Sequence, residues 1–226
     1  MSSRRLKDRL YQQLARIGKA LGSGHRLELL EILAQGERTV EKLAAETDLS
    51  IANASHHLHV LRQARLVDSR KVGLHVFYRL SEPKIYDLSL LIRDIAERHL
   101  VEVNRIVETF LTARDQLEPV AQEDLVARAR TGGVVVLDVR PADEYRAGHI
   151  PGAVSVPLKE LEKRISELPA GKEVVAYCRG PYCVLAFRAV EMLRARGRLA
   201  RRLTDGFPEW RAAGLPIEMS PKEAAS

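Results

Sequence analysis

The sequence predicts two domains, a mostly helical N-terminal domain and a C-terminal α/β domain with a parallel sheet. In the first half, apolar residues recur at three- and four-residue steps, which is the period of amphipathic helices. In the second half, short continuous apolar segments alternate with helical ones, a pattern typical of buried parallel strands. Between the halves, the polar segment ARDQLEPVAQ predicts a linker at 113–122, with domains at 1–112 and 123–226.

The 226-residue chain has the composition of an ordinary globular protein, with 46% hydrophobic and 29% charged residues. No apolar segment approaches the roughly 20 residues that cross a bilayer, and the charged N-terminal segment lacks the apolar centre of a signal peptide. We therefore expect a cytoplasmic protein that keeps its thiols reduced. The net charge of +6 is compatible with nucleic-acid binding, although many solvated surfaces carry a similar charge.

Three longer helices are predicted in the first domain. Leucine and isoleucine at helical spacing predict one at 5–21, and a second begins near His25 and ends at Gly36. A third runs from Ile85 to about Leu111, with an apolar stripe that is too long for a lone surface helix. We expect this stripe to be buried against the first helix of a second subunit.

Two shorter helices and a β-hairpin lie between the second and third of these. Thr39 can cap the helix VEKLAAET and Ser50 the helix IANASHHLHVLRQA, because each hydroxyl can accept a hydrogen bond from the first turn. The period then changes to that of strands, and LVDSRKVGLHVFYRL predicts a hairpin that turns at Val72–Gly73. Two short helices joined by a tight turn and followed by a hairpin are the pattern of a winged helix-turn-helix.

The helix after Ser50 is the expected DNA-reading element. Ala54, Leu58 and Leu61 share its inward face, which leaves small and polar side chains on the other face. An asparagine near the helix start can pair with adenine, and basic residues around the hairpin can meet phosphates. The expected DNA-binding residues are Ser50, Ala52, Asn53, Ser55, His56, His59, Arg62, Arg70, Lys71 and His75. The same pattern also fits a dimerisation module whose polar face is merely solvated.

Residues 10–82 resemble the ArsR/SmtB family of dimeric bacterial repressors. They carry the family's S-x-H-L-x-x-L core and its wing ending, which are here Ser55, His57, Leu58, Leu61 and Tyr78–Arg79–Leu80. Arg65 stands where many members have glycine. The resemblance implies a homodimer, with the first helix and the helix after Pro83 at its interface. Such a dimer would read two half-sites of operator DNA about one helical turn apart.

Many members of that family release DNA when a metal ion binds to cysteines of the third helix or to a His/Asp set of the last one. Here the third helix contains no cysteine, and His99 is the only histidine of the last helix. His56 and His57 point about 100° apart on a helix, so they do not share an ion easily. We therefore expect no metal site and no cofactor, and the regulator half lacks a sensor of its own.

The second domain alternates strands and helices. The predicted strands are 134–140, 153–157, 173–178 and 199–206, and the predicted helices are 158–168 and 184–197. Because the strands are short and continuously apolar, we expect a parallel sheet that is covered on both faces. Glu144 and His149 are expected to hold strand ends and turns together, and Trp210 to lie in the core.

Both cysteines of the chain, Cys178 and Cys183, lie in the loop between a predicted strand and the next helix. The loop amides and the positive end of the helix dipole would stabilise a thiolate on Cys178. Gly180 allows a tight curve and Arg179 adds a positive charge, so the sequence predicts an anion cradle with Cys178 as nucleophile. Alternatively, each cysteine packs as a small hydrophobe.

Residues 121–218 resemble a rhodanese homology domain. VVVLDVRPADEYRAGHIPGAVSVP matches the family's first signature, DGFPEWRAAGLPI matches the second, and Cys178 stands at the position of the catalytic cysteine. The resemblance implies that this cysteine takes a sulfane sulfur from a donor such as thiosulfate, becomes a persulfide and passes the sulfur to a nucleophile. It also implies that Asp138 and Arg140 lie near the loop. The expected site residues are Cys178, Arg179, Gly180, Tyr182, Cys183, Asp138 and Arg140.

The length of the loop separates two uses of such a cradle. Phosphatases and arsenate reductases carry a C-x-x-x-x-x-R loop whose arginine clamps phosphoryl oxygens. Here Val184 takes the arginine position, so phosphatase chemistry is not expected. The shorter sulfurtransferase loop fits residues 178–183, with the unusual feature that its last position is Cys183. A second thiol there could attack a persulfide or sulfenate on Cys178 and form a disulfide.

Together these features predict a homodimeric DNA-binding transcriptional regulator, a repressor, whose rhodanese domain senses reactive sulfur or redox state through Cys178. Its expected partners are double-stranded operator DNA, a second copy of the chain, and a sulfane-sulfur donor or small thiol. Two alternatives stay open. One is a thiosulfate or persulfide sulfurtransferase that binds DNA as a separate activity, and the other is an idle rhodanese fold that serves only for docking.

Overall fold

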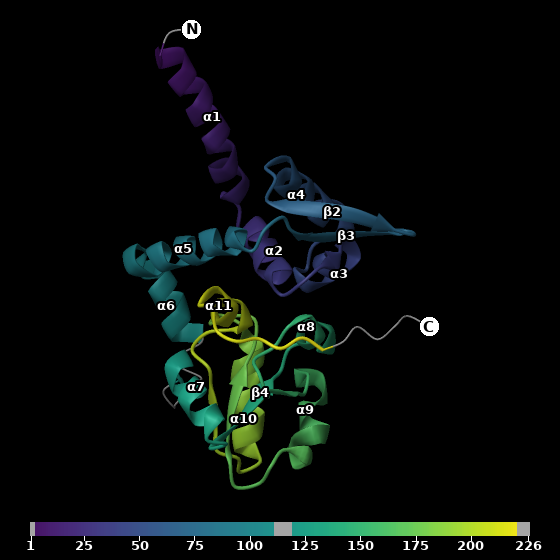
Figure 1. Ribbon diagram of the computed structural model, residues 1–226, viewed down its shortest axis with the longest axis vertical. Helices are drawn as coiled ribbons and strands as arrows, with labels where there is room; N and C mark the ends of the chain where they lie inside the picture. The colour runs from purple at the N-terminus through teal and green to yellow at the C-terminus, as the bar shows by residue number, and fades with distance from the viewer. Residues whose placement is uncertain (1–2, 111–118, 221–226) are drawn as a thin grey trace. The chain divides into compact units, whose positions relative to one another are not determined.

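The computed structural model describes residues 3–110 and 119–220, which fall into two compact units, Met1–Asp94 and Ile95–Ser226 (Figure 1). The division lies inside helix α5 (Lys84–His99). Most of the predicted linker, from residue 113 to residue 118, lies outside the described residues, so the linker stays a prediction. The two units are described separately below.

The first unit begins with four helices at the predicted places. They are α1 (Ser3–Leu21), α2 (Gly24–Ala34), α3 (Val40–Glu46) and α4 (Ile51–Gln63). The predicted caps are present, because the Thr39 hydroxyl accepts from the Lys42 amide at 3.4 Å and the Ser50 hydroxyl accepts from the Asn53 amide at 3.2 Å. These caps fix where α3 and α4 start, and therefore which side chains stand on the outer face of α4.

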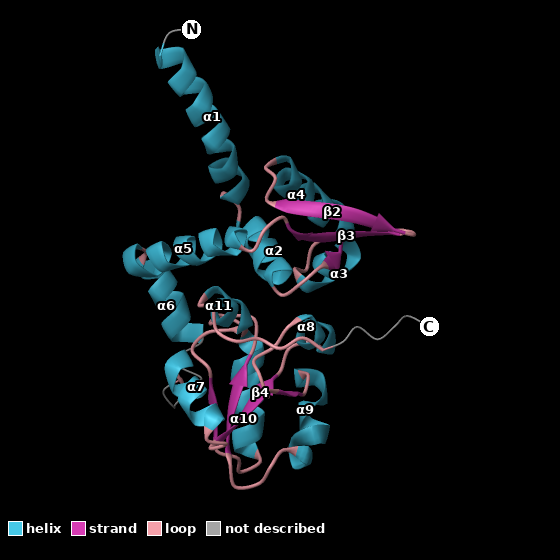
Figure 2. Ribbon diagram, in the orientation of Figure 1, coloured by secondary structure: helices cyan, strands magenta, loops and turns pink. Residues whose placement is uncertain are grey.

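The wing is a small antiparallel sheet (Figure 2). The predicted hairpin is confirmed as β2 (Val67–Val72) and β3 (His75–Leu80). Its turn lies one residue later than predicted, at Gly73–Leu74, because Val72 pairs with His75, and Gly73 has a φ of 59°. A further strand, β1 (Arg38–Thr39), pairs with the other edge of β3. Sequence analysis did not predict β1, because two residues are too few to show a strand period.

The core of the first unit lies under α4 and the wing. Leu29 and Leu30 of α2, Leu43 of α3, and Leu58 and Leu61 of α4 are completely buried. Together with the base of the hairpin they form one hydrophobic cluster. Since each buried leucine contributes about 1.5–3 kcal/mol relative to exposure, this cluster holds α4 firmly against the other helices.

The prediction of one long helix from Ile85 to about Leu111 is wrong, because the described part of this segment forms two helices. Helix α5 ends at His99, and α6 (Val101–Phe110) begins after Leu100. The Asn104 side-chain amide donates to the Glu97 carbonyl at 2.8 Å and so occupies an acceptor near the end of α5. The sequence does not show the break, because no glycine or proline marks it and the apolar period continues across it. Residue 111 lies outside the described residues.

Arg65 has a left-handed backbone, with a φ of 59°. It follows the C-cap residue of α4, and its amide donates to the Arg62 carbonyl at 2.9 Å. A left-handed position after a helix is the place where glycine is favoured, because glycine lacks the Cβ that clashes there. This explains why glycine is favoured at this position, and it makes Arg65 a non-glycine residue in a strained conformation.

Replacing Arg65 by glycine is therefore expected to raise the free energy of unfolding of the first unit by about 1 kcal/mol. The matched control is Arg62→Gly inside α4, which is expected to lower it by about 1 kcal/mol. Urea unfolding followed by far-ultraviolet circular dichroism measures both. An Arg65→Gly protein no more stable than the wild type would show that the left-handed backbone carries no strain.

The second unit contains a four-stranded parallel sheet in the order β5-β4-β6-β7 (Figure 2). Its strands are β4 (Val134–Asp138), β5 (Val154–Ser155), β6 (Glu173–Tyr177) and β7 (Ala200–Arg202). All four lie within the predicted segments. The register places Asp138 of β4 opposite Tyr177 of β6, so both strands end at the edge where the cysteine loop begins.

Helices cover both faces of this sheet, as predicted. One face packs against α9 (Leu158–Arg164) and α10 (Val184–Ala195), which meet a cluster around Leu161 and Leu193. The other packs against α7 (Gln122–Arg130) and α11 (Phe207–Ala212), through residues such as Leu125 and Trp210. Two shorter elements are α8 (Ala142–Ala147) and a 3-10 turn at Ile165–Glu167. Helices α7, α8 and α11 were not predicted, because they are too short or too polar to show an apolar period.

Among the described residues, no helix has both the length and the apolar character required to span a membrane.

Candidate functional site

The cysteine loop joins the end of β6 to the start of α10. Cys178 directly follows β6 and is 2% exposed, whereas Cys183 is the N-cap residue of α10 and is partly exposed. The Cys183 amide donates to the Gly180 carbonyl at 3.1 Å, which closes the loop into a turn. The turn begins at Gly180, where the sequence predicts a tight curve, and Pro181 and Tyr182 stand at its centre. The two thiols therefore belong to one loop but differ in access to solvent.

The segment around Gly206 presses against this loop from outside. The Phe207 amide donates to the Cys178 carbonyl at 3.0 Å. A Cβ placed on Gly206 would lie 2.3 Å from the Gly180 amide nitrogen, which is far inside van der Waals contact. Gly206 therefore lets two backbones approach closely, and this approach fixes the shape of the loop.

Cys178 is the less acidic of the two thiols. Burial raises the pKa of Cys178 well above its ordinary value, and the hydrogen bond that it shares with Cys183 raises it further. The amides of Gly180 and Ala186 oppose this effect only in part. The Cys178 sulfur also lies 3.3 Å from the Cys183 carbonyl oxygen, which can accept its proton. The loop amides expected to stabilise a thiolate on Cys178 are therefore present, but burial acts against them.

Cys183 has the opposite environment. The hydrogen bond from Cys178 lowers the pKa of Cys183 to about 7, although its partial burial acts against this. The amides of Arg179 and Leu185 and the positive charge of Arg179 lower it further. Helix α10 starts at the next residue, so the positive end of its dipole also favours a negative charge here. The thiol that the helix terminus stabilises is Cys183.

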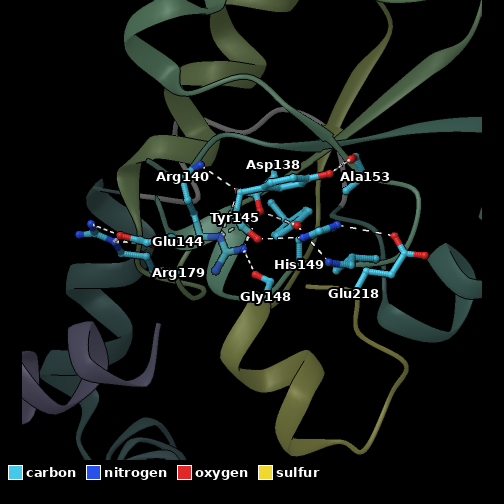
Figure 3. A network of polar contacts seen from close by, with 11 residues as sticks. Asp138, Arg140, Glu144, Tyr145, Gly148, His149, Ala153, Arg179 and Glu218 are labelled. Carbon is cyan, nitrogen blue, oxygen red and sulfur yellow. Dashed lines mark hydrogen bonds and ion pairs between the residues drawn. The ribbon is translucent and has the colours of Figure 1, made fainter. Parts of the chain in front are cut away.

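Asp138 and Arg140 form a completely buried ion pair beside the loop (Figure 3). Arg140 also donates to the Gly148 carbonyl at 2.8 Å, and the Tyr177 hydroxyl donates to Asp138 at 2.6 Å. Burial acts to lower the pKa of Arg140, but the Asp138 carboxylate outweighs it and the pKa is raised. These contacts join the end of β4 to Tyr177, the residue before Cys178. The Asp138–Arg140 pair therefore helps to fix where the cysteine loop begins.

Arg179 leans toward α8 and contacts Glu144 there. Its Nε lies 3.0 Å from one carboxylate oxygen of Glu144, which is completely buried (Figure 3). Sequence analysis assigned Glu144 to strand ends and turns, and so missed this contact with the cysteine loop. The sequence did contain a signal for this contact. Glu144 is a carboxylate in the first rhodanese signature, and Arg179 is a cation in the thiol loop of the same domain.

His149 and Trp210 occupy structural positions, as expected. The ring of His149 stacks on Tyr145 at 3.7 Å between centroids, and its Nε2 lies 3.6 Å from Glu218 (Figure 3). Trp210 is 3% exposed and donates to the Pro216 carbonyl at 2.8 Å. These contacts hold the segment after α11, which contains Pro216 and Glu218, against the rest of the second unit.

The division of α4 into an inward apolar face and an outer face is as expected. Ala54, Leu58 and Leu61 are completely buried, whereas the proposed contact residues face solvent. The exposed set consists of Ser50, Ala52, Asn53, Ser55, His56, His59 and Arg62 on α4 or its cap, and Arg70, Lys71 and His75 on the wing. The helix therefore offers a continuous polar surface.

Two of the wing cations have carboxylate neighbours in the first unit. Arg70 forms an ion pair with Glu37, with Nε 2.7 Å from the carboxylate, and stacks over Phe77. Nδ1 of His75 lies 3.9 Å from Glu41. A phosphate has to compete with these carboxylates, whereas Lys71 is exposed at the same edge. Within the described residues, no group of three or more His, Cys, Asp or Glu side chains is arranged to hold a metal ion.

Comparison with known proteins identifies both units. Residues 23–69 match the model of the arsR family of bacterial regulatory proteins, and residues 121–213 match that of rhodanese-like domains. The HTH-type transcriptional regulator Rv0324 of Mycobacterium tuberculosis is 42% identical over 94% of this chain and 93% of its own. The chain belongs to the ArsR family. It is a transcriptional regulator of that family with a C-terminal rhodanese-like domain.

Other similarities of this ArsR-family regulator cover one unit each. A sulfurtransferase of Allochromatium vinosum is 35% identical over 39% of this chain and 82% of its own. The homodimeric winged helix-turn-helix DNA-binding domain of Mb0332 from Mycobacterium bovis is 40% identical and covers 44% of this chain and 91% of its own, with a TM-score of 0.40.

Proposed function

We propose that this regulator is a homodimeric repressor that binds operator DNA through α4 and the wing, and that its rhodanese-like domain senses reactive sulfur or redox state through Cys178 together with Cys183. The observation that carries the proposal is the position of the two thiols. They are the chain's only cysteines, and both lie in the one loop between the end of β6 and the start of α10. The described residues of the winged-helix unit contain no metal-binding group.

The polar face of α4 supports the DNA-binding part of the proposal. Asn53 stands in the first turn of α4 with an exposed side chain that can donate to and accept from an adenine edge. Lys71 is an exposed cation on the wing, suited to a phosphate. The net charge of +6 adds a general attraction to nucleic acid.

Exposed apolar side chains support the homodimer. Leu6, Leu10 and Leu14 of α1 are each more than half exposed, and Leu88, Leu91 and Ile92 of α5 are also exposed. Two such stripes in one unit are typical of surfaces that are buried on association. The domain from Mycobacterium bovis, described as homodimeric, is consistent with this assignment.

Asn53 and Lys71 are expected to affect DNA binding in different ways. Replacing Asn53 by alanine should weaken binding to the preferred sequence by about 1–3 kcal/mol and leave non-specific binding unchanged. Replacing Lys71 by alanine should weaken binding to all sequences and reduce its salt dependence. Fluorescence anisotropy measures both affinities and their salt dependence, with a duplex selected from a random pool and with an unselected duplex. Equal losses on selected and random duplexes for Asn53→Ala would contradict its role in base reading.

The sensing part is tested by measuring affinity for the selected duplex before and after inorganic polysulfide. Polysulfide is expected to change the affinity of the wild type and to leave a Cys178→Ser/Cys183→Ser double variant unaffected. A double variant that responds like the wild type would contradict sensing by the loop. The double variant is expected to fold, because each serine replaces a cysteine with little change in size. Thermal unfolding checks this.

A second candidate function is a thiosulfate or persulfide sulfurtransferase that binds DNA as a separate activity. The observation in its favour is that amides surround both sulfurs, which suits an anionic persulfide. Steady-state turnover of thiosulfate that survives Cys183→Ser and does not respond to operator DNA would favour this function over sensing.

A further inference from the structure

We propose that the hydrogen bond between Tyr182 and Glu97 transmits a change in the cysteine loop to helix α5, and that reaction of the loop thiols with sulfur releases this bond. The inference rests on the proposed function, in that it takes reaction at the thiols to alter DNA binding. It goes beyond that function by naming the contact through which the change leaves the loop.

Tyr182 connects the cysteine loop to a distant part of the sequence. It stands at the centre of the turn, directly before Cys183. Its hydroxyl donates a hydrogen bond to a carboxylate oxygen of Glu97, 85 residues earlier in the chain. Both residues belong to the second unit, Ile95–Ser226, and both are partly buried. Because a hydrogen bond to a carboxylate is stronger than one between neutral groups, this contact ties the loop to the last turn of α5.

Glu97 lies close to the place where α5 ends and α6 begins. Its backbone carbonyl accepts from the Asn104 side chain at 2.8 Å, across the break at Leu100. The same helix carries exposed apolar side chains, which are Leu88, Leu91, Ile92 and Ile95. These side chains extend to within two residues of Glu97. Since α5 is one continuous helix, a displacement of its last turn is passed along to the stripe that we assign to the dimer.

The start of the cysteine loop is held more firmly than its turn. Cys178 directly follows β6, and its carbonyl accepts from the Phe207 amide at 3.0 Å. The backbone of Gly180 is held against Gly206, where a Cβ would lie 2.3 Å from the Gly180 nitrogen. Because these contacts fix the loop on one side, a change in its shape falls on the turn that carries Tyr182.

Reaction of a loop thiol with sulfur requires such a change of shape. When the thiolate takes the terminal sulfur of a polysulfide chain, an S–S bond of the chain breaks, a persulfide forms on the cysteine, and the shortened polysulfide leaves. Cys178 is 2% exposed, and both cysteines pack against the hydrophobic cluster between β6 and α10. The added sulfur therefore fits only if the loop moves, because protein interiors are close-packed. Tyr182 adjoins Cys183, so its hydrogen bond to Glu97 is released.

The test measures affinity for the selected duplex before and after inorganic polysulfide in full-length wild type, Glu97→Ala and Glu108→Ala, with the modified fraction read by intact mass. Glu108 is the matched control, because it is an exposed carboxylate on α6. Wild type and Glu108→Ala are expected to change affinity by about 5- to 150-fold, and Glu97→Ala by less than about twofold. Unreacted Glu97→Ala is expected to bind like the reacted wild type, because it already lacks the hydrogen bond.

Two further variants separate the hydrogen bond from other effects on α5. Glu97→Gln keeps an oxygen that can accept from Tyr182, so it is expected to retain a response to polysulfide. Tyr182→Phe removes only the hydroxyl and is expected to match Glu97→Ala when the two are compared at equal modified fraction. The double variant Glu97→Ala/Tyr182→Phe is expected to differ no further from the wild type than either single variant, because both lose the same contact.

Hydrogen exchange of the backbone amides follows the movement itself. In the wild type, the amides of residues 95–104 are expected to exchange at a different rate after polysulfide, because their anchor to the loop is released. In Glu97→Ala their rate is expected to stay constant. Unchanged exchange in this segment of a wild-type protein that does change its affinity would overturn the proposal.

Two results separate this link from the proposed function. If Glu97→Ala binds and responds like the wild type while the wild type changes its affinity, the link is wrong and sensing by the loop stands. If the loop is fully modified and the affinity of the wild type does not change, the proposed function fails and the inference fails with it.

Discussion

Replacing Arg140 by methionine is expected to destabilise the rhodanese-like unit by roughly 3–5 kcal/mol. Arg140 and Asp138 are both completely buried, and Arg140 contacts Asp138 through its backbone amide and its guanidinium. Methionine removes the cation and leaves the carboxylate buried, with the Tyr177 hydroxyl still donating to it at 2.6 Å. The cost therefore comes mainly from the unpaired charge and not from the lost attraction.

The double variant Asp138→Asn/Arg140→Met is the matched control. It removes both charges while keeping an amide oxygen that can accept from Tyr177, so it should recover part of the lost stability. Urea unfolding followed by the fluorescence of Trp210, the chain's only tryptophan, reports on this unit. A single variant that loses less than about 1 kcal/mol would show that the buried pair is not required, contrary to what its burial implies.

Replacing Gly206 by alanine is expected to slow the reaction of Cys183 with iodoacetamide or polysulfide by about a hundredfold. The added Cβ would lie 2.3 Å from the Gly180 nitrogen, and both neighbours in this contact are backbone, so the loop itself has to move. Such a movement separates Cys183 from the amides that stabilise its thiolate. Binding of the reduced protein to DNA is expected to be retained.

Gly133→Ala is the control for this variant. A Cβ at Gly133 would meet its nearest neighbour, the Thr131 hydroxyl, at 3.4 Å, which is ordinary contact. Both rates are measured at pH 8, where Cys183 is mainly thiolate, so that a changed pKa and a changed position are not confused. If Gly206→Ala reacts as fast as Gly133→Ala, the close approach of the two backbones is not what shapes the loop.

Much of the fold follows from periodicity and caps. Thr39 and Ser50 mark the starts of α3 and α4 because their hydroxyls accept the hydrogen bonds that the sequence predicts. The break at Leu100 did not follow, because neither glycine nor proline marks it and the apolar period continues across it. Strand β1 did not follow either, since only its partner β3 makes it a strand.

Sequence analysis predicted which residues form the candidate site, but not how the environment of each thiol differs. The spacing of Cys178 and Cys183 and the strand-loop-helix pattern indicate a thiol loop. Which thiol carries the negative charge depends on burial and on where α10 begins, and these are known only from the folded chain. In the same way, the partner of Arg179 is Glu144, from a helix too short to leave a period in the sequence.

The central claim is that the thiol loop controls DNA binding, and the most direct test follows both events in the same samples. Full-length protein is titrated with polysulfide, and each sample is divided between intact-mass analysis and anisotropy with the selected duplex. The account predicts that the change in affinity follows the fraction of modified loop at every point and is reversed by dithiothreitol. Complete modification of the loop with no change in affinity would contradict it.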